Sequence, residues 1–123
     1  MNAAELKKRL ESLPRYQFII LAGGSMVMHG LREETNDVDI CVSQNLADEL
    51  GLSGVQPNEK GYYELPNDLD VTVGMDRFPC EQVDGYLCQR LEEILKFKKR
   101  RNEPKDQQDI ERIEEYFAQQ GRS

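Results

Sequence analysis

An apolar segment near the start of the chain constrains the fold more than any other feature. It covers Tyr16 to Ala22, is densest at Phe18 to Ala22, and lies between Pro14 and Gly23. Aromatic and β-branched residues bounded by proline and glycine are typical of a strand that is buried on both faces. The segment is far shorter than the ~20 apolar residues that cross a bilayer, so we expect no membrane span.

Two later segments alternate between polar and apolar residues, which is the pattern of strands with one polar face. In 37–43, Asp37 and Asp39 alternate with valine and isoleucine, and in 69–73 Asp70 lies between Leu69 and Val71. If the two strands are neighbours and both apolar faces point into the core, Asp70 lies on the same face as the other two carboxylates.

The remaining pattern predicts helices and one more strand. We expect helices over 3–13, 25–29 and 45–50, a strand over 61–65, a long helix from Glu81 to about Arg101, and a last helix after Pro104 that ends near Gly121. The predicted fold class is therefore α+β (α/β): one domain over 1–123 with a small mixed sheet, helices packed mainly on one face, and C-terminal helices from about residue 81.

Charge and cysteine content narrow the class of protein. Sixteen basic and 23 acidic residues give a formal net charge of −7, which argues against a general duplex-binding protein. Three cysteines cannot all pair with one another, so we expect free thiols in a reducing compartment. No secretory leader is evident at the N-terminus, and we expect a cytoplasmic protein.

The residues most suggestive of chemistry are a glycine turn and the three acids. Glycines let backbone amides approach a ligand closely, a helix N-terminus attracts phosphate, and Ser25 after Gly23-Gly24 adds a hydroxyl donor. Asp37 and Asp39 share a strand face at a spacing that suits Mg²⁺. Adding Asp70 brings three like charges together, and one or two divalent cations would remove their repulsion.

These motifs resemble those of a known superfamily. Gly-Gly-Ser, then His-Gly, then Thr-x-Asp-x-Asp, a later lone Asp on a strand, and Lys-Asp-x-x-Asp near the C-terminus resemble nucleotidyltransferases of the polymerase-beta-like fold. The similarity is to the small single-domain type found in antibiotic nucleotidyltransferases and nucleotidyltransferase toxins, and it covers about 18–113. It implies that Asp37, Asp39 and Asp70 are catalytic and hold the metal. The residues that it implies for NTP binding are Gly23, Gly24, Ser25, Arg32, Thr35 and Lys105.

The activity that we expect is Mg²⁺-dependent transfer of a nucleoside monophosphate from an NTP to a hydroxyl group, with release of pyrophosphate. The acceptor is an RNA end, a protein or a small molecule. The alternative is a non-catalytic nucleotide-binding or regulatory module of the same fold, such as a component of a toxin–antitoxin pair, and a homodimer is a further possibility.

The sequence also suggests roles for several other charged residues. The basic run Lys96 to Arg101 is either a solvated helix end or a basic rim for phosphates or an RNA end. Lys105 and Asp109 are spaced to pair across one helical turn. Asp106 lies on an apolar helix face, so we expect it to have a partner, and we expect a structural role for His29, the sole histidine.

Overall fold

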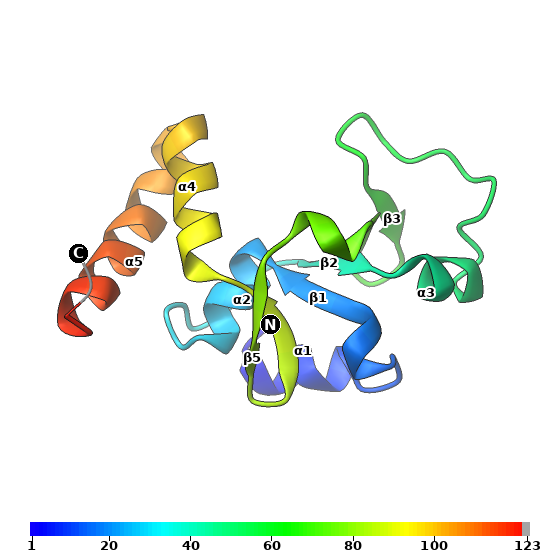
Figure 1. Cartoon of the computed structure of the whole chain (residues 1–123), viewed down its shortest axis with the longest axis horizontal. Helices are drawn as coiled ribbons and strands as arrows, with labels where there is room; N and C mark the ends of the chain where they lie inside the picture. The colour runs from blue at the N-terminus through cyan, green and yellow to red at the C-terminus, as the bar shows by residue number, and fades with distance from the viewer. Residues whose placement is uncertain (122–123) are drawn as a thin grey trace.

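The computed structural model describes residues 1–121, and within them the chain forms a six-stranded mixed sheet with five α-helices (Figure 1). The helices are α1 (Ala3–Leu10), α2 (Ala22–Met28), α3 (Gln44–Glu49), α4 (Leu91–Arg101) and α5 (Gln107–Gln119). The strands are β1 (Phe18–Leu21), β2 (Val38–Val42), β3 (Tyr63–Leu65), β4 (Leu69–Val73), β5 (Cys80–Val83) and β6 (Tyr86–Gln89). Short 3₁₀ turns cover Arg15–Gln17, Met75–Arg77 and Pro104–Asp106. Among these described residues, no helix has both the length and the apolar character needed to span a bilayer.

The apolar segment forms the buried strand that the sequence predicts, although it is shorter. All four residues of β1 are buried, and the strand lies inside the sheet, whose order is β3-β4-β2-β1-β6-β5. β1 is antiparallel to β2 and parallel to β6, and β2 is parallel to β4. The sequence also predicts α1 to extend to residue 13, but the helix ends at Leu10 and a turn leads to Pro14.

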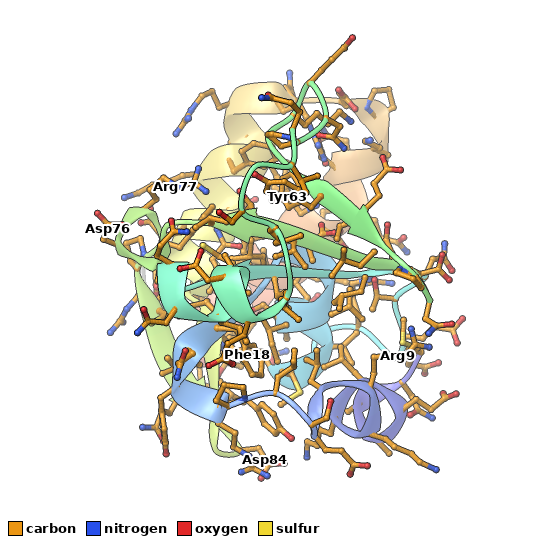
Figure 2. The ribbon with its side chains drawn as sticks, turned by 90° about the vertical axis from the view of Figure 1, so that its right-hand side faces the viewer. Arg9, Phe18, Tyr63, Asp76, Arg77 and Asp84 are labelled. Atoms are coloured by element: carbon orange, nitrogen blue, oxygen red, sulfur yellow. The ribbon has the colours of Figure 1, made fainter. Side chains whose placement is uncertain are left out.

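Three helices cover one face of the sheet. Leu6 and Leu10 of α1, Met28 of α2 and Leu46 of α3 pack with strand residues that include Phe18, whose ring points into the interior (Figure 2). The opposite face carries a smaller apolar cluster. It consists of Ile19, Leu21 and Cys41, covered by Ala22, Met75, Phe78, Cys80 and Leu87. The prediction of helices mainly on one face is confirmed. The three cysteines form no disulfide.

The prediction of a helix starting at Glu81 is wrong. Residues 80–89 form an antiparallel hairpin, β5–β6, with Asp84 and Gly85 at its tip (Figure 2), and the helix begins only at Leu91. Asp84 and Gly85 have φ angles of 53° and 82°, which is the backbone of a tight hairpin turn. An Asp-Gly pair favours that turn, so this dipeptide indicates a hairpin even though the spacing of the apolar residues suggests a helix.

Helices α4 and α5 form an antiparallel pair that projects from one side of the sheet (Figure 1). Leu91 and Ile94 of α4 and Ile113 of α5 pack on Met26 of α2. Because α2 directly follows β1, this contact fixes the helical pair beside the glycine turn. The last helix follows Pro104 and is followed by Gly121 with a φ of 73°, as the sequence predicts.

Candidate functional site

Three carboxylates from two neighbouring strands meet at one end of the sheet. Asp37 immediately precedes β2, Asp39 lies on β2, and Asp70 lies opposite Asp39 in the parallel β2–β4 pair. One carboxylate oxygen of each lies within 4.8 Å of the others. Val38 and Ile40 are fully buried on the other face, so the predicted alternation is confirmed. The sequence prediction that these three side chains converge is therefore confirmed.

The surroundings of Asp37, Asp39 and Asp70, here called the acidic triad, disfavour the negative charge of these side chains. Burial raises the pKa of Asp39 to about 7, and the nearby charges of Asp37 and Asp70 add to the effect, whereas Lys60 acts against it. Burial and the charge of Asp37 also raise the pKa of Asp70. Within residues 1–121, none of the three carboxylates forms an ion pair with a basic side chain.

The donor set fits a hard divalent cation. Three carboxylates, without a cysteine or histidine among them, form the oxygen-rich environment that Mg²⁺ prefers, and a cation there would offset the mutual repulsion of the acids. Asp37 is exposed and the other two are partly buried, so the site is open to solvent on one side.

The two glycines of the predicted turn, Gly23 and Gly24, lie in the first turn of α2, which directly follows β1. A Cβ atom on Gly23 would lie 2.8 Å from Arg32 Nη1 and 2.9 Å from Thr35 Oγ1, so the missing side chain lets both groups approach the backbone. Gly24 has a different role, because a Cβ there would lie 3.0 Å from Ile20 in the core. Thr35 Oγ1 donates to the Asp37 carbonyl at 3.0 Å, which ties the loop to the start of β2.

Ser25 does not lie in the site. Its side chain is fully buried, and its hydroxyl donates to the Gln89 carbonyl at 2.7 Å. The prediction that this hydroxyl contacts a phosphate is therefore wrong for this structure, because the helix already begins at Ala22 and turns Ser25 toward β6. The expected structural role of His29 agrees with its contacts: Nδ1 is 2.8 Å from the Ser25 carbonyl and Nε2 is 2.9 Å from Glu81 Oε1.

A cavity of about 530 Å³ joins the sheet end to the α4–α5 pair. Its volume is within the range of roughly 300–1,000 Å³ that small-molecule sites occupy. On the sheet side the lining residues are Gly23, Gly24, Arg32, Thr35, Asn36, Asp37 and Asp39. On the helical side they are Lys98, Arg101, Lys105, Asp106, Gln108, Asp109 and Arg112. Five basic side chains therefore share one cavity with two of the triad carboxylates.

Two buried acids hold most of these basic side chains in place. Asp106 is fully buried, and Arg101 donates to both of its carboxylate oxygens, at 2.9 and 2.5 Å. These hydrogen bonds hold the pKa of Asp106 well below its usual range. Asp109 forms ion pairs with Lys98 at 3.2 Å, Arg112 at 3.3 Å and Arg32 at 3.7 Å.

These contacts bear on three interpretations drawn from the sequence. The expectation that Asp106 has a partner is confirmed. The pairing of Lys105 with Asp109 is wrong, because Lys105 Nζ lies 3.4 Å from Glu103 and Asp109 binds other cations. The basic run is divided: Lys98 and Arg101 line the cavity, whereas Lys96, Lys99 and Arg100 do not.

Sequence reasoning missed Arg112 and Tyr62. Arg112 lies three residues after Asp109 on α5, a spacing that would have indicated their pairing. Tyr62 precedes β3, and its pKa is raised to about 12 by burial and by the charges of Asp39 and Cys41. Tyr62 follows a long loop, and no sequence motif indicated that this residue would be buried near Asp39.

Comparisons of this chain with protein-family models, with curated proteins and with solved structures found no match.

Proposed function

We propose that the protein is a Mg²⁺-dependent nucleotidyltransferase that moves a nucleoside monophosphate from an NTP to a hydroxyl group and releases pyrophosphate. One observation carries the proposal: three carboxylates without basic partners in the described chain adjoin a cavity whose other lining residues include five cations. A triphosphate with bound magnesium is complementary to both parts, since its cation suits the acids and its phosphates suit the basic residues.

Several residues at or beside the cavity have a part in this proposal. Asp37, Asp39 and Asp70 would hold Mg²⁺, which when bound neutralises phosphate charge and lowers the pKa of the attacking hydroxyl. Arg32 and Lys105 would neutralise the remaining charge of the triphosphate. Gly23, with no side chain, lets the Arg32 guanidinium and the Thr35 hydroxyl lie against the backbone, where both would donate to a phosphate.

The proposed reaction is an exchange of phosphorus–oxygen bonds. The acceptor oxygen forms a bond to the α-phosphorus, the bond from the α-phosphorus to the bridging oxygen breaks, and pyrophosphate leaves. The acceptor proton passes to a carboxylate of the triad, and Asp70, opposite Asp39 in the parallel β2–β4 pair, is the candidate base. Electrostatic positioning by fixed charges would supply most of the rate enhancement.

The deciding experiment incubates the protein with Mg²⁺ and labelled NTPs in the presence of total RNA, protein or a panel of small-molecule hydroxyl acceptors. We expect label transfer and pyrophosphate release, and a loss of more than about a hundredfold in Asp37→Asn and Asp39→Asn. Asp84→Asn is the matched control. That carboxylate lies at the hairpin tip, outside the cavity, and asparagine tolerates its positive φ. Undiminished transfer in both site variants would refute the proposal.

A melting experiment separates an enzyme from a non-catalytic binding module. Ligands that bind only the native state raise its melting temperature, so we expect Mg²⁺ and NTP together to raise it more than either alone. Stabilisation by both ligands without transfer to any acceptor class would favour the regulatory module instead. Absence of stabilisation and of transfer would exclude both.

A further inference from the structure

Phe97 is an exposed aromatic residue of α4 that lies next to Arg101, a residue lining the cavity. Its exposure is 50%, and it is one of three large apolar side chains of residues 1–121 that are this exposed. Arg101, one turn later on α4, places its guanidinium carbon 4.9 Å from the centre of the Phe97 ring. The guanidinium therefore covers one face of the ring, and Arg101 itself lines the cavity.

The position of Phe97 on α4 places it on the side away from α5. Lys99 Nζ forms an ion pair with Glu114 of α5 at 2.8 Å, so Lys99 marks the side that faces α5. Phe97 is two residues from Lys99, which corresponds to about 200° around a helix. Phe97 is therefore on nearly the opposite side, next to the cavity-lining Arg101.

The guanidinium of Arg101 is fixed before any ligand binds. Its Nε and Nη2 donate to the two oxygens of Asp106, which is fully buried at the start of α5. The two hydrogen bonds fix the orientation of the guanidinium plane, and the Phe97 ring lies against it. A ligand that stacks here would not have to order the arginine side chain, so the entropic cost of binding is reduced.

We propose that Phe97 and Arg101 form the stacking site for the nucleobase of the NTP. The inference rests on the proposed function, in which the triphosphate occupies the region between the acidic triad and Gly23. The base is the flat and uncharged end of such a ligand. Of the side chains that line or border the cavity on α4, Phe97 and Arg101 provide a planar surface, whereas Lys98 is held by Asp106 and Asp109.

A stacking site of this kind predicts that the protein binds NTPs without selecting one nucleobase. Every nucleobase has a π-face, and stacking on aromatic or guanidinium planes is tolerant of base identity. We therefore expect the site to accept several NTPs, with purines favoured by their larger stacking area.

The test compares two probes with and without a base, in the presence of Mg²⁺. The probes are ATP with a methylene group between its α- and β-phosphorus atoms, which cannot be cleaved there, and inorganic tripolyphosphate. In Phe97→Leu we expect the affinity for the ATP analogue to fall about tenfold, because base–aromatic stacking is worth roughly 1–3 kcal/mol. Affinity for tripolyphosphate should not change, and Phe97→Tyr should bind both probes like the unaltered protein.

The matched control is Tyr16→Leu, because Tyr16 is an aromatic residue that is also exposed, at 64%, and does not line the cavity. It should leave both affinities unchanged. Unaltered binding of the ATP analogue in Phe97→Leu would overturn the stacking site, and so would an equal loss for both probes, which indicates a structural role. Loss of transfer to an RNA acceptor with unaltered analogue binding would also overturn it, by assigning the surface to the acceptor. If neither probe binds the unaltered protein, the proposed function itself fails.

Discussion

Asp106 and Asp109 form ion pairs with several cations, whereas Asp37, Asp39 and Asp70, at the sheet end of the same cavity, form none with a basic side chain of residues 1–121. Hydrogen bonds from Arg101 lower the pKa of Asp106, whereas burial and like charges raise the pKa of Asp39. Asp106 and Asp109 are neutralised by basic side chains of the protein and fix the orientation of those side chains. The triad retains uncompensated charge and so favours a cation from solution.

The largest stability effect should come from removing one member of the neutralised group. Asp106→Asn leaves Arg101 and the buried Lys98 without their shared counter-charge. Breaking a buried pair in this way costs about 3 kcal/mol, taking the low end because Arg101 is partly exposed. In a domain of this size that cost lowers the melting temperature by roughly 10 °C, measurable by thermal unfolding.

Glu103→Gln is the matched control for Asp106→Asn. Glu103 contacts the same Arg101 at 3.9 Å, but its side chain is 47% exposed. An exposed pair contributes about 0–1 kcal/mol, so we expect little change in its melting temperature. If Asp106→Asn melts at the same temperature as Glu103→Gln, the distinction between the two acid groups no longer holds.

Asp39→Asn should have a smaller stability effect of opposite sign. The folded-state pKa of Asp39 is raised to about 7, while the unfolded value is near 4. Between those pH values the folded state binds more protons than the unfolded state, so this group makes stability fall as pH rises from about 4 to about 7. Without metal, the unaltered protein should melt a few degrees higher at pH 5.5 than at pH 8, and Asp39→Asn should reduce that difference.

Magnesium adds a second readout on the same variant. At pH 8, Mg²⁺ should raise the melting temperature of the unaltered protein and of Asp84→Asn, and should have little effect on Asp39→Asn. An equal response of all three proteins would show that the ion binds elsewhere. An unchanged pH dependence in Asp39→Asn would contradict the assigned electrostatics.

The two acid groups also differ in how far the sequence predicts them. The triad follows from local alternation, since Asp39 and Asp70 each lie between apolar residues whose burial leaves one face for the acids. The partners of Asp109 on other elements do not follow from such a rule. Helical spacing places Asp109 on a face of α5, but Arg32 and Lys98 reach it from other elements, which only the packing of the whole chain brings near.

Two of the incorrect predictions share a physical cause. Apolar residues at helical spacing suggested a helix through 81–90, but the positive φ values that Asp84 and Gly85 adopt favour a hairpin. Ser25 follows two glycines, yet the early start of α2 at Ala22 turns its hydroxyl inward. In both regions, one or two backbone conformations decided the structure against a side-chain pattern.

The smallest expected effect on stability concerns Gly23, which lies between the two acid groups. Gly23→Ala adds a Cβ 2.8 Å from Arg32 Nη1, the far end of a flexible side chain that also pairs with Asp109, and 2.9 Å from Thr35 Oγ1, which is buried and donates to the Asp37 carbonyl. Arg32 can move, and the shift required of Thr35 is offset by the preference for alanine over glycine in a helix, roughly 0.5–1 kcal/mol, so the melting temperature should change by only a few degrees. The added methyl group displaces Arg32 and Thr35 from the positions in which they would donate to a phosphate, so affinity for tripolyphosphate should fall several-fold. Gly121→Ala, outside the cavity, should leave that affinity unchanged. Unchanged tripolyphosphate binding in Gly23→Ala would show that the phosphates do not bind beside Gly23. It would assign them instead to the helical side of the cavity, where Asp106 and Asp109 hold the other cations.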